Sequence, residues 1–350
     1  MRGLAVVLFC LLPLIAAAED AVVRPGAALR FPFDHGAHPA FHTEWWYVTG
    51  WLATRDHREL GFQITFFRTR AKADPDNPSR FNPRQVIFAH AALSDPRAGK
   101  LLHDQRAARQ GFGLAEAAVG NIDVSLDDWS LVRAHDGSMR ATVASNAFAL
   151  ALDLTPTQAE LPQGDGGYSR KGPAAEEASY YYSLPHIRVS GSIREAGQDE
   201  EVGGEAWLDH EWSSRMLAAD AVGWDWLGIN LDDGGALTAF RLRASDGGTV
   251  WAGGSLRGGD GKTTIFTPAD VMFEPVRQWR SPRTNATYPV EWRVRVRDLG
   301  FTVRPLFDDQ ELDSRIAGGP VYWEGAVRCD GGAQGRGYLE MTGYLERLKL

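Results

Sequence analysis

The chain has 350 residues, a formal net charge of −8 at pH 7 and a hydrophobic fraction of 44%. The acidic balance argues against nucleic acid or an anionic membrane surface as a partner. The length suits one large domain or two of ordinary size, and it favours two.

Residues 1–18 have the pattern of a cleavable signal peptide. Arg2 supplies the positive end, an apolar run extends from Leu4 to Ile15, and three alanines form a small-residue cleavage site. The apolar run is too short to cross a bilayer, and no later run is long enough. We therefore expect cleavage after Ala18, a periplasmic or secreted protein, and no transmembrane segment in the mature chain.

The stretch from Thr43 to Trp51 is the strongest strand signal. It contains three tryptophans, one tyrosine and one carboxylate, and aromatic and β-branched residues favour strands. Alternation puts Glu44 and Trp46 on one face and Tyr47 on the other. Both faces are largely apolar, which predicts burial on both sides. Since a buried carboxylate is costly unless it is paired or protonated, Glu44 either bonds nearby backbone at a strand entry or belongs to a functional site.

Further strand-like segments follow at short intervals, each bounded by turn-forming residues. Helical periodicity is weak, and only Ser214–Ala221 suits one or two helical turns. Many short strands predict an all-β sandwich or barrel. The predicted strands of the first half are Gly61–Arg70, Gln85–Ser94, Asp123–Leu131, Met139–Ala144, Phe148–Leu154, Tyr180–Ile193 and Glu201–Trp212.

The second half repeats the layout of the first. Gly223–Gly228 (Gly-Trp-Asp-Trp-Leu-Gly) echoes the tryptophan-rich strand. An internal repeat of this length indicates two similar β-domains with a boundary within Ser213–Val222. The other echoing segments are Ala236–Arg243, Trp251–Leu256, Val321–Ala326 and Gly337–Tyr344.

The segment Gly203–Trp212 is the sharpest candidate for chemistry. Asp209, His210 and the following glutamate are three ionisable residues in a row, which does not suit a plain core strand. Alternation puts Asp209 on the face of Trp207 and His210 on the opposite face. One interpretation is a carboxyl whose pKa is raised by an apolar wall, with His210 positioning water. The other is a strand end at a barrel mouth, where the charges meet solvent.

Three histidines, His35, His38 and His42, lie within eight residues and raise the question of a metal. They occupy a loop rich in Gly and Pro, so their spacing defines no shared face, and the helical His-Glu-x-x-His pattern is absent. We expect a structural loop, no metal site and no cofactor.

The run Tyr180–Ser183 places Tyr182 where its hydroxyl either bonds a ligand or reaches solvent at the rim. No Gly-x-Ser-x-Gly elbow supports a serine hydrolase. No phosphate loop or dinucleotide fingerprint is present.

Together these segments resemble the AttH-like family, which is lipocalin-like and includes the carotenoid 1,2-hydratases. The resemblance covers nearly the whole mature chain. It implies two tandem lipocalin-like antiparallel β-barrel domains, which we place at residues 24–215 and 216–350, and an apolar site near their junction. The segments that carry it are His35–Pro39, Thr43–Tyr47, Tyr181–Ser183, Gly204–Trp212, Gly223–Gly228 and Gly337–Tyr344.

The resemblance also implies site residues. In the hydratases a His-x-Trp pair is proposed to contribute to the site, and His210 with Trp212 matches it. A Tyr-x-Asp pair proposed on a following strand has no counterpart in Ala236–Phe240.

The resulting hypothesis is a lyase or isomerase, hydratase-like, acting without a cofactor on a lipid-like or isoprenoid molecule. Asp209 or Glu44 would protonate an alkene and His210 would hold the water, while tryptophan rings would stabilise the cation. The predicted ligand contacts are Trp46, Tyr47, Tyr182, Trp212, Trp224, Asp225 and Trp226.

Two alternatives remain open. One is a periplasmic protein that binds a hydrophobic ligand and works with an ABC transporter. The other is a secreted hydrolase. A binding protein needs only the cavity, whereas the enzyme needs the acid.

Overall fold

The computed structural model describes residues 20–71, 77–79 and 81–349. The signal peptide predicted at residues 1–18 lies outside these ranges. In the described part, the only helical segments are three 3-10 turns, η1 (Phe33–His35), η2 (Pro268–Asp270) and η3 (Arg315–Ala317). No helix there combines the length and apolar character that crossing a membrane requires.

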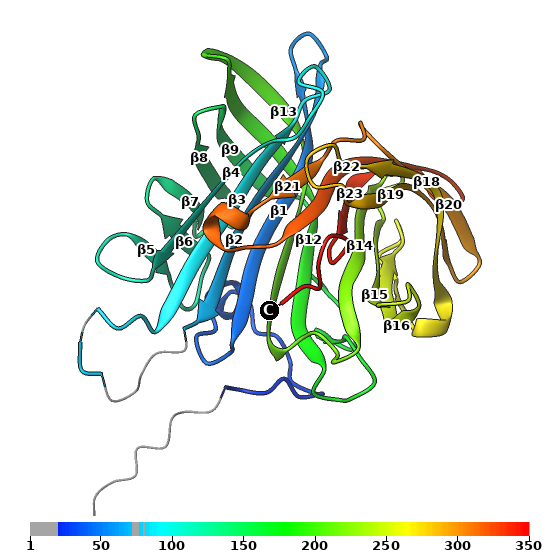
Figure 1. Cartoon of the computed structure of the whole chain (residues 1–350), viewed down its shortest axis with the longest axis horizontal. Helices are drawn as coiled ribbons and strands as arrows, with labels where there is room; N and C mark the ends of the chain where they lie inside the picture. Colours follow the sequence, from blue (N-terminus) through cyan, green and yellow to red (C-terminus); the bar gives the residue numbers. More distant parts are fainter. Residues whose placement is uncertain (1–19, 72–76, 80, 350) are drawn as a thin grey trace, which may run out of the picture.

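The first half of the described chain forms one antiparallel sheet of thirteen strands (Figure 1). Their bounds are β1 (Thr43–Thr54), β2 (Glu59–Arg70), β3 (Gln85–Ser94), β4 (Leu102–Arg109), β5 (Ala115–Ala117), β6 (Asp123–Leu126), β7 (Trp129–Arg133), β8 (Met139–Ala144), β9 (Phe148–Pro156), β10 (Leu161–Pro162), β11 (Tyr168–Arg170), β12 (Ala178–Glu195) and β13 (Gln198–Arg215). The strand order is β4-β3-β2-β1-β13-β12-β9-β8-β7-β6-β5, and β10 and β11 both pair with β12.

The second half forms a separate antiparallel sheet, with ten strands among the described residues. Their bounds are β14 (Ala221–Leu231), β15 (Ala236–Ala244), β16 (Thr249–Arg257), β17 (Thr263–Phe266), β18 (Val271–Arg280), β19 (Thr287–Val296), β20 (Leu299–Pro305), β21 (Glu311–Asp313), β22 (Val321–Gly331) and β23 (Gly335–Met341). The order is β17-β16-β15-β14-β23-β22-β20-β19-β18, and β21 pairs with β22.

Each sheet curves into a near-barrel, and the two stand side by side (Figure 1). The prediction of an all-β fold with two antiparallel lipocalin-like barrels is confirmed. The chain passes from one sheet to the other between Arg215 and Ala221, which supports 24–215 and 216–350 as the domain limits that we propose. The helical turn predicted at Ser214–Ala221 is wrong, because β13 continues through Arg215 and a turn follows.

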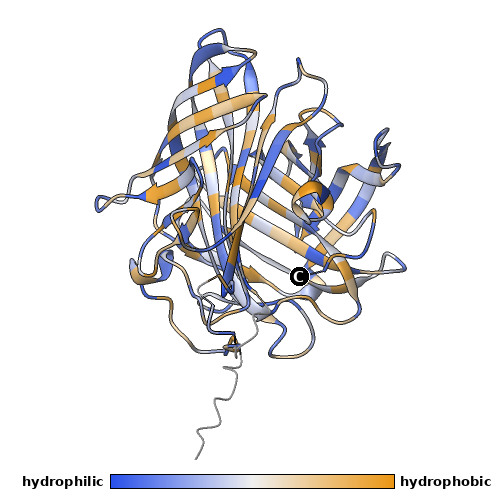
Figure 2. Cartoon of the chain, turned by 60° about the vertical axis from the view of Figure 1, so that its left-hand side comes forward, coloured by the Kyte–Doolittle hydropathy of each residue, from blue (hydrophilic) through white to orange (hydrophobic). Residues whose placement is uncertain are grey.

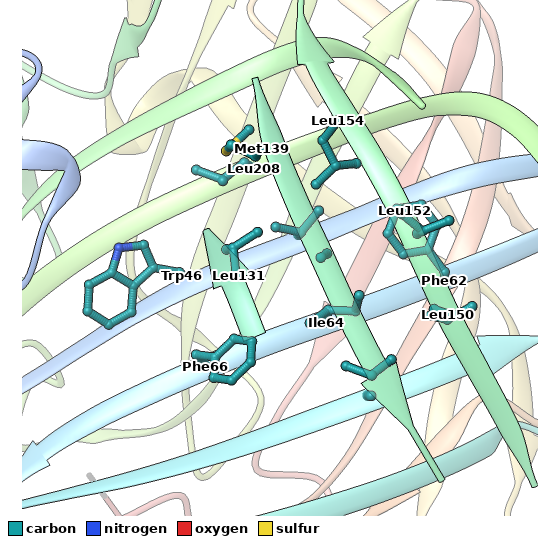
Figure 3. Close-up of a cluster of buried hydrophobic side chains, with 14 of the residues drawn as sticks. Trp46, Phe62, Ile64, Phe66, Leu131, Met139, Leu150, Leu152, Leu154 and Leu208 are labelled. Carbon is teal, nitrogen blue, oxygen red and sulfur yellow. The ribbon is translucent and has the colours of Figure 1, made fainter. Parts of the chain in front are cut away.

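The interior of the first near-barrel is filled by one apolar face of its strands. Trp46 of β1 and Phe66 of β2 pack with Leu131 of β7 and Leu152 of β9 in one buried cluster (Figure 3). Apolar and polar residues alternate along many strands (Figure 2), since successive side chains point to opposite faces of a sheet.

The opposite face of β1 packs against the second sheet. Tyr47, Trp51 and Trp207 share a buried cluster with Trp226 and Tyr338 across the junction, and the indole Nε1 of Trp51 donates to the backbone of β23 at 3.1 Å. The prediction that β1 is buried on both faces, with Trp46 and Tyr47 on opposite sides, is confirmed.

Gly337 of β23 lies where that strand passes closest to β14. A Cβ at this position would lie 1.8 Å from the carbonyl oxygen of Gly228. Because overpacking costs about 1–3 kcal/mol even where side chains can shift, we expect Gly337→Ala to lower the free energy of unfolding by about 2 kcal/mol or more. Urea unfolding measures it. Gly300→Ala is the control, because its added Cβ meets nothing within 4 Å; equal losses in the two variants would contradict the prediction.

Candidate active site between the two sheets

A cavity of about 490 Å³ lies between the two sheets. Its walls come from β1, β2, β3 and β13 on one side and from β14, β15, β22 and β23 on the other. Strand alternation explains the lining, because Tyr47 and Asp209 point into the cavity while their neighbours on the same strands point into the first barrel. The aromatic lining residues are Trp45, Tyr47, Phe67, Phe88, Trp224, Trp226, Phe240 and Tyr322.

Four acidic side chains line the inner part of this cavity, and a fifth, Glu346, lies at its rim. Asp209 and Glu211 come from β13, Glu324 from β22 and Glu340 from β23. Lys171 is the one buried cation among the lining residues that the structure describes, and its Nζ pairs with Glu211 at 2.9 Å.

Asp209 is held by neutral donors. Its Oδ1 accepts hydrogen bonds from the Ser183 hydroxyl at 2.5 Å and from the Trp207 indole at 2.7 Å, and its Oδ2 accepts one from the Tyr181 hydroxyl at 2.7 Å. Burial raises the pKa of Asp209 to about 7, although these three hydrogen bonds oppose the rise; the charge of Glu211 adds to it. Near neutral pH this carboxyl can therefore both hold and release a proton.

Glu324, which is buried, and Glu340, which is partly buried, are two further acids of the lining. Burial raises the pKa of Glu340 to about 7, against one hydrogen bond from the Trp224 indole. The pKa of Glu324 lies well above its ordinary value because of burial and the charge of Glu340, although Tyr47 and Tyr322 favour the ionised form. The Oε1 atom of Glu324 makes no hydrogen bond of ordinary geometry with any described residue. A buried carboxyl with a raised pKa and no charged partner among the described Lys and Arg residues thus lines the cavity.

His90 lines the cavity from the first sheet and contacts Tyr322 of the second. Its Nδ1 lies 2.7 Å from the Tyr322 hydroxyl, and its Nε2 is buried without a partner among the residues described. Burial lowers the pKa of His90 to about 3. The ring is therefore neutral at physiological pH and can accept a hydrogen bond from a water or a ligand.

The other face of the β1–β13 pair carries a second polar cluster, inside the first barrel. Glu44 Oε1 lies 2.7 Å from His38 Nδ1 and 2.9 Å from His210 Nε2, and Glu44 Oε2 accepts from Arg68 Nε at 2.7 Å. Burial opposes ionisation, yet the hydrogen bonds from the two histidines hold the pKa of Glu44 far below its ordinary value. Burial lowers the pKa of His210 to about 4.

The structure therefore separates the predicted catalytic residues. Asp209 lines the cavity, whereas Glu44 and His210 lie on the far side of the same strand pair. Of the predicted ligand contacts, Tyr47, Trp224 and Trp226 line the cavity. Those in the first barrel with His210 are Trp46, Trp212 and Tyr182.

Asp225 lies in a third environment. It is fully buried on the face of β14 opposite Trp224 and Trp226. Its carboxylate pairs with Arg241 at 2.7 Å and Arg243 at 3.1 Å and accepts from the Tyr344 hydroxyl at 2.8 Å. It is absent from the cavity lining, and it serves as a paired internal charge of the second barrel.

The cluster in the first barrel contains residue types that could bind a metal ion. One ligand atom each from His38, Glu44 and His210 lie within 4.8 Å of one another. These atoms already satisfy each other, and Arg68 neutralises the carboxylate, so the donor set suits a hydrogen-bonded ion pair better than a cation site. The other two loop histidines contact different groups: His35 Nδ1 lies 2.7 Å from the Tyr182 hydroxyl, and His42 Nδ1 lies 3.5 Å from Asp20.

Sequence reasoning missed Glu324, Glu340, His90 and Lys171. A signal for the first two was present, because each is a glutamate within an aromatic or apolar strand, the pattern that singled out Glu44. Lys171 belongs to a Gly- and Pro-rich loop whose path carries no periodic signal.

The fold is that of a lipocalin-like protein built from two near-barrels with a cavity between them. The AttH-like family profile matches residues 22–344, so the chain belongs to the AttH-like family. None of the curated proteins matches the chain.

Solved structures share this fold. A crystal structure assigned as an AttH from Nitrosomonas europaea is 55% identical, covers 93% of this chain and 99% of that one, and has a TM-score of 0.87. Kievitone hydratase from Nectria haematococca is 14% identical over 93% of this chain and 96% of that one, with a TM-score of 0.70. CghA with Sch210972 is 12% identical over 87% and 89%, with a TM-score of 0.53.

The raised pKa of Asp209 predicts a pH dependence of stability. A carboxyl whose pKa rises from 3.8 to about 7 on folding favours the folded state fully below about pH 4, and this contribution is lost as the pH climbs through 7. Relative to wild type, Asp209→Asn should gain roughly 4 kcal/mol in free energy of unfolding between pH 4 and pH 8. Denaturant unfolding across this range tests it.

The exposed Asp298→Asn is the control for that series. It should differ from wild type by a constant amount at every pH. A flat difference for Asp209→Asn as well would show that Asp209 is not desolvated in the folded protein.

Proposed function

We propose that the chain is a hydro-lyase of the hydratase type that acts on an apolar small molecule, lipid-like or isoprenoid, in the cavity between the two sheets. One observation carries the proposal: carboxyls with raised pKa, Asp209 and Glu324 among them, line a cavity walled by aromatic rings. The fold shared with a kievitone hydratase supports the reaction class.

Protonation of the alkene is the first step. The Glu324 carboxyl transfers its proton to one alkene carbon, the π electrons form the new C–H bond, and the other carbon becomes a carbocation. The indoles of Trp224 and Trp226 lie on the same wall as this acid. Their faces stabilise a positive charge at short range.

Addition of water completes the reaction. A water held at the free Nε2 of His90 adds to the cation, and the new C–O bond leaves one proton to be removed. Asp209, on the opposite wall, accepts it, because its pKa of about 7 lets it alternate between both forms near neutral pH. Exchange of a proton through cavity water returns both carboxyls to their starting states.

The cluster of Glu44 with His210 lies on the face of β1 and β13 that points away from the cavity. It satisfies buried polar atoms on the inner face of the two strands whose outer face carries Tyr47 and Asp209. We propose that it fixes the register of β1 and β13 rather than touching the substrate.

The acids give a direct test of the enzymatic function. Asp209→Asn and Glu324→Gln each keep the shape of the side chain and remove the ionisable group, so turnover should fall by about 10²–10⁴-fold while ligand binding persists. Mass spectrometry of water added to isoprenoid and fatty-acid alkenes supplies the assay, and tryptophan fluorescence reports binding. Glu116→Gln, on an exposed position of β5, is the matched control and should retain full turnover.

The second candidate is a protein that only binds its ligand and hands it to an ABC transporter. The sequence favours it at one point, the missing Tyr-x-Asp pair in Ala236–Phe240. In that case Asp209→Asn would leave both binding and transport intact, and no tested alkene would gain water.

Export is part of the proposal. The signal-peptide pattern of residues 1–18 predicts that the protein recovered from the periplasm or medium begins at residue 19. Intact mass of the exported protein measures this directly. A soluble exported product that retains residues 1–18 would contradict the cleavage site.

A further inference from the structure

In the inner part of the cavity, acidic side chains outnumber cationic ones. Glu211 has Lys171 as a partner, but Asp209, Glu324 and Glu340 form no salt bridge with any Lys or Arg in the part of the chain that the structure describes. The remaining charged lining residues, Glu346, Arg347 and Lys349, are exposed and lie at the rim.

An unpaired buried carboxylate is costly. Protonation reduces this cost by neutralising the carboxylate. A cation bound beside the carboxylates would reduce it by pairing with their charge. The Oε1 atom of Glu324, a residue only 3% exposed, makes no hydrogen bond of ordinary geometry with the described residues, and the neighbours that favour its ionised form are the neutral hydroxyls of Tyr47 and Tyr322. The buried hydroxyl of Tyr47 likewise makes no hydrogen bond of ordinary geometry within the described part of the chain, and its polar neighbour is Glu324.

Aromatic rings from both sheets meet at the cavity. The rings of Trp45 and Trp224 lie nearly parallel with centroids 6.4 Å apart, and Tyr47 meets Trp226 edge to face at 5.3 Å. Each pair joins one residue from the first sheet to one from the second. Aromatic faces attract organic cations, and desolvation strengthens that attraction. Lys171 already uses the same chemistry, since its Nζ lies 4.2 Å from the centroid of the Phe240 ring.

We propose that the cavity selects ligands that carry one positively charged group, such as an organic ammonium, on an apolar body. The carboxylates of Glu324, Glu340 and Asp209 would face the charge, and the tryptophan rings would cover the apolar part. The inference rests on the proposed function for the location of the site only. In that reaction the positive charge is transient, whereas an ammonium carries it permanently.

The test compares three probes of similar size at pH 7. Benzyltrimethylammonium carries the charge, neopentylbenzene is its neutral carbon isostere, and phenylacetate is an anion. Titration calorimetry and quenching of tryptophan fluorescence measure binding to the full-length mature protein. We expect the ammonium to bind at least tenfold more tightly than the neutral isostere and phenylacetate to bind most weakly. Equal affinities for the ammonium and its isostere would overturn the inference.

Substitutions then place the preference in this cavity. Glu324→Gln and Glu340→Gln should each reduce the ratio of ammonium to isostere affinity severalfold, while the affinity for neopentylbenzene changes little. Glu116→Gln makes the same exchange on an exposed strand away from the cavity and should leave the ratio unchanged. If the ratio of ammonium to isostere affinity is unchanged in both cavity variants, the ammonium binds elsewhere and the assignment of the cation site to this cavity is refuted.

Proton release is a readout that needs no variant. A cation among the carboxyls favours their ionised forms, so ammonium binding to wild type at pH 7 should expel protons, whereas neopentylbenzene should not. Calorimetry in two buffers of different ionisation enthalpy counts them. Binding of the ammonium without proton release would contradict the proposal. The titratable and charged groups that face the cavity are Asp209, Glu211, Glu324, Glu340, Lys171, His90, Tyr47 and Tyr322, with Glu346, Arg347 and Lys349 at the rim.

These outcomes are independent of the hydratase assay. Ammonium selectivity without any hydrated product would leave the cation site standing and refute the hydro-lyase. Hydration without ammonium selectivity would do the reverse.

Discussion

The antiparallel pairing of β1 with β13 is the constraint on which both barrels depend. In this register Trp46 lies opposite His210 and Tyr47 opposite Asp209. One face of the pair closes the core of the first barrel and the other forms a wall of the cavity. Because side chains alternate with a period of two, a slip of one residue in β13 would turn Asp209 into the apolar interior and His210 into the cavity. The site and the core are therefore specified by the same hydrogen-bond ladder.

The two faces of this strand pair shift the pKa of a buried carboxyl in opposite directions. Glu44 is charged, because Arg68 and two histidines surround it, and its pKa lies far below the ordinary value. Asp209 has only neutral donors and another acid nearby, so burial dominates and its pKa rises to about 7. Paired charge gives a rigid, specific contact, whereas an unpaired carboxyl stores free energy that protonation or a ligand can release. This difference is the basis on which we propose a structural role for the cluster of Glu44 and a chemical role for Asp209.

Much of the fold was predictable from strand patterns, and the misses have physical causes. The buried strands β3 and β8 match their predicted bounds, because turn formers flank their apolar or alternating segments. The edge strand β4 (Leu102–Arg109) was missed, since most of its residues are polar and none is fully buried. Asp123–Leu131 was predicted as one strand but is divided into β6 and β7 by a turn at Asp127, whose φ of 59° lies in the left-handed region.

The site itself was only half predictable, because alternation assigns faces but not the environment that each face meets. From the sequence, Asp209 and His210 lie on opposite faces, yet nothing local says that one face meets a second barrel. That barrel supplies Glu324, Glu340 and Tyr322, more than a hundred residues further along the chain. A cavity of this kind exists only because two sheets bring unlike faces together. The desolvation that raises the pKa of Asp209 and Glu340 is therefore a property of the junction, and no single strand carries it.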